Sequence, residues 1–187
     1  MNLNYNEEQN MLREQIQKFC ESDYDFYKRE EIIKSANDFD ENVWKLFAEQ
    51  GWLLMPFSEE SGGLGFGPIE LSILFEEFGK ALVIEPYLST VVLSGLLLDK
   101  SSYVKKNDLI EKICSGQMHI SFAYAEAGKS YDYLSAETSL SSDYVLNGTK
   151  TLVLNGACSD KLLVTCASDD TLKIIILDST TQGVSIN

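Results

Sequence analysis

Through roughly the first 116 residues, apolar side chains recur every three or four positions, which is the spacing of one face of an α-helix. The pattern predicts five helices, and the fourth is apolar on nearly all sides, so we expect it to be central. The expected buried stripes are Met11, Leu12, Ile16, Phe19 and Cys20; Val43, Trp44, Phe47 and Ala48; Leu71, Leu74, Phe75 and Phe78; Leu88, Val91, Val92, Leu96 and Leu97; and Val104, Leu109, Ile110 and Ile113.

Four of these helices begin at a recognisable start signal. Asn6 followed by Gln9 resembles a capping box, in which each side chain bonds the other residue's backbone N–H. Asp40 predicts a second N-cap. Pro68 and Pro86 suit the first turn of a helix, where a backbone N–H has no partner in the helix. These signals set the expected helix starts.

From Met118 onward the hydrophobic period falls toward two, and the chain reads as short strands. The predicted strands lie within residues 119–125, 143–149, 161–167 and 173–178. Asn147-Gly148 and Asn155-Gly156 are hairpin signals, because the favoured two-residue turn needs positive φ at both positions. Short strands at about ten-residue spacing favour an antiparallel β-barrel or sandwich.

The predicted fold class is therefore α+β multidomain, with an N-terminal all-α helical domain followed by an antiparallel β-barrel or sandwich domain. We place the helical domain at residues 1–117 and the β domain at 118–187. The strand pattern is still running at Asn187, and the β part is short for a complete barrel, so we expect this domain to be truncated.

The composition and net charge of the chain exclude several classes of protein. The 187 residues include 15 Lys and Arg against 29 Asp and Glu, for a net charge of -14, which argues against binding nucleic acid or an anionic membrane surface. Hydrophobic residues make up 44% of the chain, too many for a disordered protein. No secretory signal is visible, and the most apolar stretch, 91–98, is too short for a membrane span. We expect a cytoplasmic protein.

Candidate nucleophiles and metal ligands are few. Cys20, Cys114, Cys158 and Cys166 have no C-x-x-C spacing, and we interpret them as reduced, buried thiols rather than as disulfides or zinc ligands. His119 is the only histidine, and no G-x-S-x-G elbow accompanies it, so we interpret it as structural. No metal site is predicted.

Two further patterns are also interpreted as structural. The glycines of residues 61–67 do not fit G-x-G-x-x-G or a P-loop, so the loop is expected to need unusual backbone angles rather than to cradle a nucleotide. Glu76 and Glu77 are adjacent, and such neighbours do not face each other on a helix. We therefore expect them to form solvated surface.

The order of short motifs carries the interpretation further. Residues 3–20 place an acidic-acidic-Gln triplet before a Leu-Arg pair. Residues 43–82 contain Trp-Lys, Gly-Trp, a Pro-x-x-x-Glu-x-Gly-Gly-x-Gly loop and a helix ending in Glu-Glu-x-Gly. This order resembles that of the acyl-CoA dehydrogenase family of flavoproteins, across essentially the whole chain.

Two segments of the β part extend the resemblance. Residues 122–132 are similar to the family's Thr-Glu-Pro strand and loop, and residues 146–164 to its Gly-x-Lys-x-Trp-Ile-Thr-Asn segment. Glu126 and Lys150 are among the residues that match the family's motifs. The resemblance implies that these segments hold FAD. The cofactor-binding positions carried over are Phe122, Tyr124, Ala125, Tyr131, Leu152 and Leu154.

Several of these positions depart from the family pattern. Ala125 stands where Thr is usual, and Leu152 and Leu154 replace a Trp and a Thr, so a stacking ring and two hydroxyls are lost. Tyr131 places a bulky phenol where Ser is expected. Backbone donors do not depend on side-chain identity, so main-chain contacts to the cofactor are expected to remain.

The resemblance implies an FAD-dependent acyl-CoA dehydrogenase, which oxidises an acyl-CoA thioester to the 2,3-enoyl-CoA and passes electrons to an electron-transfer flavoprotein, usually as a homo- or hetero-oligomer. The family's catalytic Glu lies in a C-terminal helical domain that has no match here. We therefore assign no catalytic residue and expect this chain alone to be inactive. One alternative is a non-catalytic structural subunit or degenerate homologue that pairs with a catalytic dehydrogenase. Another is an unrelated helical interaction module fused to a β-barrel.

Overall fold

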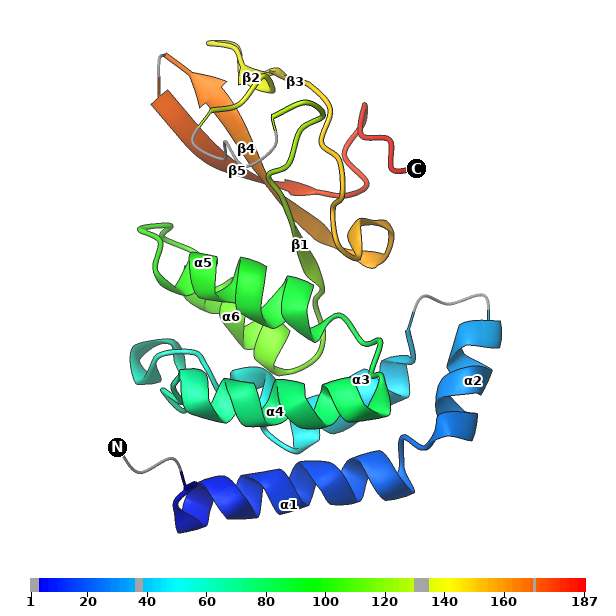
Figure 1. Cartoon of the computed structure of the whole chain (residues 1–187). Coiled ribbons are helices and arrows are strands. Elements are labelled where there is room, and N and C mark those ends of the chain that lie inside the picture. The colour runs from blue at the N-terminus through cyan, green and yellow to red at the C-terminus, as the bar shows by residue number, and fades with distance from the viewer. Residues whose placement is uncertain (1–3, 36–38, 130–134, 170) are drawn as a thin grey trace. The chain divides into compact units, whose positions relative to one another are not determined.

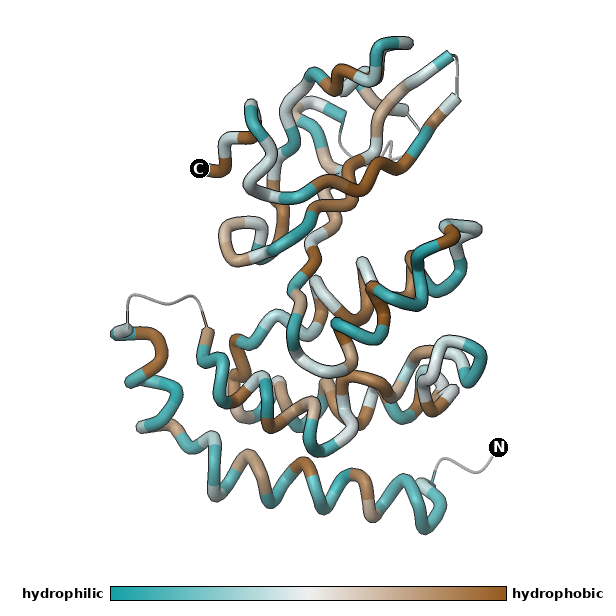
Figure 2. Tube along the Cα trace, turned by 180° about the vertical axis from the view of Figure 1, so that it is seen from behind, coloured by the Kyte–Doolittle hydropathy of each residue, from teal (hydrophilic) through white to brown (hydrophobic). Residues whose placement is uncertain are grey.

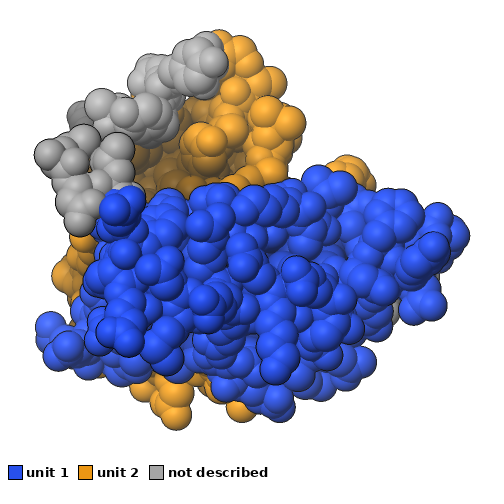
Figure 3. Space-filling view, turned by 60° about the horizontal axis from the view of Figure 1, so that its bottom comes forward, with its two compact units in different colours: residues 1–85 blue, residues 86–187 orange. Residues whose placement is uncertain are grey.

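The computed structural model describes residues 4–35, 39–129, 135–169 and 171–187 (Figure 1). The chain forms two compact units, Met1–Glu85 and Pro86–Asn187, coloured separately in Figure 3. The change from helices to strands falls between Cys114 and Ile120. The second unit begins earlier than residue 118, because the first strand packs against the helical segment that precedes it. The predicted class, helical part followed by sheet part, is confirmed.

In the described part of the first unit, four α-helices begin where local capping favours a start. They are α1 (Glu7–Ser22), α2 (Phe26–Lys34), α3 (Glu41–Glu49) and α4 (Pro68–Ala81), with short 3₁₀ turns at Trp52–Leu54 and Glu59–Ser61. The capping box at α1 is confirmed: Gln9 N–H donates to Asn6 Oδ1 at 2.8 Å, and Asn6 N–H donates to Gln9 Oε1 at 3.0 Å. Helix α2 escaped prediction because Ile32 is its only buried residue, so it shows no apolar stripe.

An aromatic cluster forms the core of this unit. The rings of Phe47 and Phe78 stack with their centroids 4.9 Å apart, and Phe19 meets Trp52 edge to face at 5.2 Å. These side chains come from α1, α3, α4 and the 3₁₀ turn between them, so their burial fixes the packing of those elements. Met11, expected in the buried stripe of α1, is instead 65% exposed.

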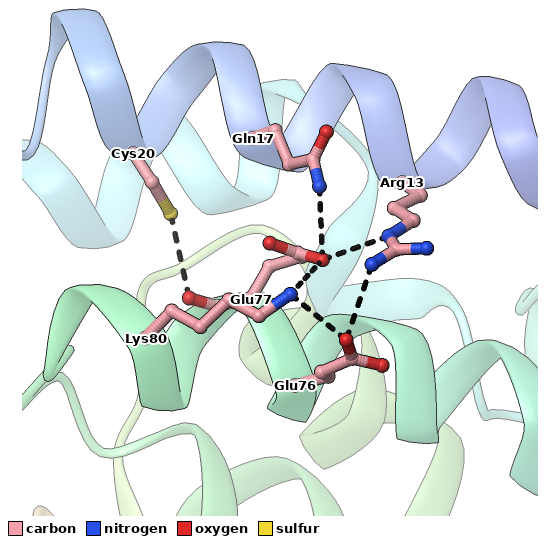
Figure 4. Close-up of polar contacts among 6 residues, drawn as sticks. All are labelled: Arg13, Gln17, Cys20, Glu76, Glu77 and Lys80. Carbon is pink, nitrogen blue, oxygen red and sulfur yellow. Dashed lines mark hydrogen bonds and ion pairs between the residues drawn. The ribbon is translucent and has the colours of Figure 1, made fainter.

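Glu77 lies between α1 and α4, and the expectation of solvated surface is wrong for it (Figure 4). Its side chain is only 5% exposed, and Oε1 accepts from Arg13 Nε at 2.9 Å, Lys80 Nζ at 2.9 Å and Gln17 Nε2 at 3.1 Å. Burial raises the pKa of Glu77, but the hydrogen bonds from Lys80, Arg13 and Gln17 outweigh it and hold the pKa below its usual range. Glu76 is the exposed partner that the sequence predicted.

The glycine loop is confirmed as a structural element. Gly62 has φ +85°, a left-handed conformation that favours glycine. At Gly63, a Cβ atom would lie 2.2 Å from the carbonyl oxygen of Phe57, so no other residue fits without moving that backbone. The loop folds back along residues 54–57 through backbone hydrogen bonds from Leu64, Gly65 and Phe66.

The second unit begins with helices that support the sheet. They are a π-helix (Leu88–Gly95), α5 (Leu96–Asp99) and α6 (Lys106–Cys114). The buried residues of the π-helix include Ser89, Thr90 and Ser94 as well as Val91. The helix contacts the strand β1 (Ile120–Ala123), where Ile120 N–H donates to Thr90 Oγ1 at 3.3 Å.

The sheet contains β1, β2 (Ser139–Leu140), β3 (Leu146–Asn147), β4 (Lys161–Ser168) and β5 (Thr171–Asp178). Strand β4 pairs in parallel with β1 and with β2, and antiparallel with β5, while β2 and β3 are antiparallel. Figure 2 colours β4 and β5 largely as hydrophobic. The predicted antiparallel barrel or sandwich is thus corrected to a mixed sheet, because the long connection from β1 returns the chain to β4 in the same direction.

Both predicted hairpin turns are wrong. The β2–β3 turn lies at residues 141–145, where Val145 carbonyl accepts from Ser141 N–H at 3.0 Å and Tyr144 takes the positive φ. Asn147 belongs to β3, and Asn155 leads into a 3₁₀ turn at Gly156–Cys158. The Asn-Gly pairs do reflect left-handed or close-packed backbone, but tertiary contacts place the turns elsewhere.

All four cysteines are free thiols. Burial raises the pKa of Cys20 to about 11 and that of Cys114 to about 12, so both stay protonated near neutral pH. Among the described residues, none of the helices combines the length and apolar character that crossing a membrane requires.

We predict that Glu77→Ala lowers the free energy of unfolding by about 2 kcal/mol, because it removes three hydrogen bonds to a buried carboxylate and leaves Arg13 and Lys80 without it. Glu76→Ala is the matched control, since Glu76 is 44% exposed and its loss is expected to destabilise the chain far less. Urea unfolding of both variants measures the difference. Equal losses from the two would show that burial of Glu77 does not stabilise the α1–α4 contact.

Candidate functional site

Two segments of the sheet unit, residues 124–126 and 150–152, lie side by side. Thr151 N–H donates to the Ala125 carbonyl at 2.9 Å, which joins their backbones directly. Glu126 and Lys150 flank this bond, and their side chains form an ion pair of 2.7 Å. The segments follow β1 and β3, so the sheet brings together residues that lie about 25 positions apart in the chain.

Glu126 accepts hydrogen bonds from three residues. Its Oε1 accepts from Thr138 N–H at 2.9 Å, from Thr138 Oγ1 at 2.6 Å and from Lys150 Nζ at 2.7 Å. Its Oε2 accepts from Glu137 N–H at 2.6 Å. The carboxylate therefore ties the segment that enters β2 to the chain after β1.

Lys150 extends this network to β4. Its Nζ donates to Thr165 Oγ1 at 2.8 Å and to the Tyr124 carbonyl at 3.4 Å, in addition to Glu126. The side chains of Glu126 and Lys150 are only 4% and 7% exposed. Two buried charges are expensive unless they are paired and hydrogen-bonded, and here both conditions are met.

The environment of Glu126 keeps it ionised. Burial raises the pKa of this carboxyl, but the hydrogen bonds from the Glu137 backbone, Lys150 and Thr138 outweigh burial and lower the pKa to about 2. The carboxylate is thus charged at neutral pH and fully engaged. A group in this state is poorly suited to accept a proton from a substrate.

Gly148 packs closely against Thr138, which belongs to this hydrogen-bond network. A Cβ atom at this position would lie 2.5 Å from Thr138 Oγ1 and 2.6 Å from Thr138 Cα. Neither atom is free to move, because Thr138 is held by Glu126. Only glycine therefore allows the chain after β3 to pass so close to Thr138.

Both segments carry exposed apolar side chains, which we together call the apolar face. Tyr124 is 44% exposed, Leu154 is 50% exposed and Leu152 is 87% exposed, while Phe122 and Ala125 are half-buried. The rings of Phe122 and Tyr124 lie 5.2 Å apart between their centroids. These exposed apolar side chains offer contact area to an apolar ligand.

The structure thus brings together five of the six predicted cofactor positions. Phe122, Tyr124 and Ala125 lie on or just after β1, and Leu152 and Leu154 lie on the neighbouring segment. The sixth, Tyr131, lies outside the described residues. The sequence missed Thr138 and Thr165, since isolated threonines carry no signal until the fold places Thr138 against Glu126 and Thr165 against Lys150.

The apolar face offers contact area to a planar aromatic ligand, but three of its side chains cannot hydrogen-bond to one. Aromatic and aliphatic side chains offer contact area to a ring system such as a flavin. Ala125, Leu152 and Leu154 have no side-chain donors, so hydrogen bonds to such a ring from these positions must come from backbone groups. The residues therefore fit the apolar surface of FAD, with main-chain recognition of its polar edge.

Possible metal ligands do not cluster in the described part of the chain, which contains no group of three or more His, Cys, Asp or Glu that could hold a metal ion. His119 lies 3.9 Å from Asp160 between Nδ1 and Oδ2, and its backbone N–H donates to the same carboxylate at 2.8 Å. This pairing links β1 to the start of β4.

Known proteins match this chain in sequence over its whole length. A family model described as acyl-CoA dehydrogenase, N-terminal domain, matches residues 6–117. The probable acyl-CoA dehydrogenase YngJ of Bacillus subtilis is 26% identical over 198 aligned positions, which cover 100% of this chain and 52% of YngJ. The chain spans about half the length of the curated relatives that it matches end to end.

Solved structures share the fold. A chain of the ChsE4–ChsE5 complex from Mycobacterium tuberculosis superposes with a TM-score of 0.87 at 23% identity, covering 100% of this chain and 51% of that one. A glutaryl-CoA dehydrogenase from Mycobacterium smegmatis, in complex with FADH2, gives a TM-score of 0.84 at 17% identity, with 96% and 47% covered. The mixed sheet described above is thus the sheet of a known fold.

We predict that the contribution of Glu126 to stability is lost at low pH. Because its folded pKa of about 2 lies below the ordinary value of 4.5, this contribution is present above about pH 4.5 and disappears as the pH falls toward 2. Urea unfolding between pH 6 and pH 2.5 should show a smaller loss of stability for Glu126→Gln than for the unsubstituted chain. At pH 7 the same substitution should cost about 3 kcal/mol, because it leaves Lys150 buried without its counter-charge.

Glu137→Gln is the control for this experiment, because Glu137 is a nearby glutamate whose side chain is exposed. It should leave the pH dependence unchanged. Parallel pH curves for Glu126→Gln and the unsubstituted chain would contradict the lowered pKa.

Proposed function

This chain belongs to the acyl-CoA dehydrogenase family, and we propose that its sheet unit holds FAD against the face formed by Tyr124, Leu152 and Leu154. The observation that carries the proposal is the juxtaposition of the two segments through Thr151 and Ala125, above a buried ion pair. A glutaryl-CoA dehydrogenase of the same fold binds FADH2, which supports the choice of ligand.

The proposed reaction of the whole protein is the α,β-dehydrogenation of an acyl-CoA thioester to the 2,3-enoyl-CoA. Bound FAD supplies the two-electron acceptor for this chemistry, and an electron-transfer flavoprotein is the proposed next acceptor. In this chain, Tyr124 and Phe122 provide apolar contact that keeps water from one side of the site. The backbone around Ala125 and Thr151 orients the ligand.

We propose no proton-abstracting residue within this chain. Glu126 is the carboxylate closest in sequence to the face, and it is buried, ionised and bonded to Lys150 and Thr138. In the proposal, the base comes from the half of the relatives that this chain does not match. Substrate oxidation therefore needs more than these 187 residues.

A second candidate is a subunit that pairs with a catalytic homologue. It is favoured by the lost donors at Ala125, Leu152 and Leu154, which weaken the case for tight flavin binding. It is also supported by the ChsE4–ChsE5 complex, a neighbour in fold in which two different proteins associate. The two candidates differ in whether this face binds FAD.

Titration with FAD, followed by flavin fluorescence, decides between them. We predict saturable binding by the unsubstituted chain and about fivefold tighter binding by Ala125→Thr, because one added hydrogen bond contributes about 1 kcal/mol. Ala157→Thr, an exposed position in the 3₁₀ turn after Asn155, should leave the affinity unchanged. No FAD binding by either the chain or Ala125→Thr would favour the partner-subunit function.

A further inference from the structure

Leu152 has a conformation that its own side chain does not explain. Its φ is +53°, in the left-handed region that leucine rarely adopts, at a cost of roughly 1–2 kcal/mol. The side chain is 87% exposed, so packing of the leucine itself supplies little to offset that cost. Strained backbone persists only where neighbouring structure holds it in place.

The neighbouring structure lies on the N-terminal side of Leu152. Thr151 is fixed through its N–H to the Ala125 carbonyl, and Lys150 is fixed at three points: Glu126, Thr165 and the Tyr124 carbonyl. Hydrogen bonds thus fix the positions of both residues that precede Leu152. The conformation of the exposed apolar face therefore depends on this hydrogen-bond network.

Lys150 is the group that connects the pieces. Thr138 bonds the Glu126 carboxylate and, through its own carbonyl, accepts from Ala167 N–H of β4 at 2.8 Å, whereas Nζ of Lys150 reaches the carboxylate, Thr165 of β4 and the backbone of Tyr124 together. Removing the ammonium would release the second segment from all three and leave Glu126 buried without its counter-charge. These three contacts meet at a single side-chain atom, Lys150 Nζ.

We propose that Lys150 is a positioning residue, which holds Leu152 in its left-handed conformation and so sets the apolar face for the flavin. The inference rests on the proposed function for the identity of the ligand, but its structural part concerns the chain without ligand. Lys150 itself lies beneath the face and acts through Thr151 and Leu152.

Lys150→Met tests the proposal, because methionine keeps much of the apolar stem and removes the charge. In the flavin-free chain, amide hydrogen exchange of Thr151 should accelerate at least about tenfold, while the β4–β5 amides stay protected. FAD binding should weaken by about the same factor. Lys161→Met is the matched control: it breaks the Lys161–Asp178 pair in the same sheet, and both readouts should stay within about twofold.

A third variant separates positioning from general support of the fold. Glycine adopts positive φ without strain, so in the Leu152→Gly background the same Lys150→Met change should accelerate Thr151 exchange by a clearly smaller factor. An equal factor in both backgrounds would show that Lys150 supports the sheet without holding Leu152, and would overturn the proposal. So would unchanged Thr151 exchange in Lys150→Met.

If Lys150→Met fails to fold, Thr165→Val tests the same proposal. It removes one acceptor of Lys150 without leaving an unpaired charge, and it should accelerate Thr151 exchange about threefold. Unchanged exchange in this variant would count against the proposal. Absence of FAD binding by the unsubstituted chain would contradict the proposed function, whereas the exchange data on the flavin-free chain decide the role of Lys150 separately.

Discussion

The buried ion pair between Glu126 and Lys150 is the interaction on which the sheet unit's candidate site depends. Two charges lie almost fully out of water, and they are tolerated because five hydrogen bonds to Glu137, Thr138, Thr165 and each other satisfy them. Glu137 and Thr138 precede β2, whereas Thr165 lies in β4. The pair therefore forms only when β1, the approach to β2, the exit from β3 and β4 are all in place.

A similar solution appears in the helical unit. Glu77 is buried between α1 and α4, where Arg13, Gln17 and Lys80 satisfy one of its oxygens (Figure 4). In both units a carboxylate with a lowered pKa joins elements that are distant in sequence. The apolar core supplies most of the packing, and the buried carboxylates select one alignment of the elements, since misalignment would leave a charge unpaired.

Much of the fold was predictable because its signals are local. The capping box at Asn6 and Gln9, the proline at the start of α4 and the short apolar runs of β4 and β5 depend only on neighbouring residues. The candidate cofactor positions came from a resemblance in motif order. Strand direction and the hairpin turns were mispredicted, because parallel pairing of β1 with β4 depends on a long connection that carries no local signal.

By itself, the sequence determined the helical and strand-forming parts, the family resemblance and the absence of side-chain donors at Ala125, Leu152 and Leu154. Only the tertiary structure decided that Glu77 is buried, that the sheet is mixed, and that Thr138 bonds Glu126 while Thr165 bonds Lys150. The physical reason is the same in each case. A residue type states which bonds a side chain is able to make, whereas burial and the approach of distant strands decide which of those bonds it must make.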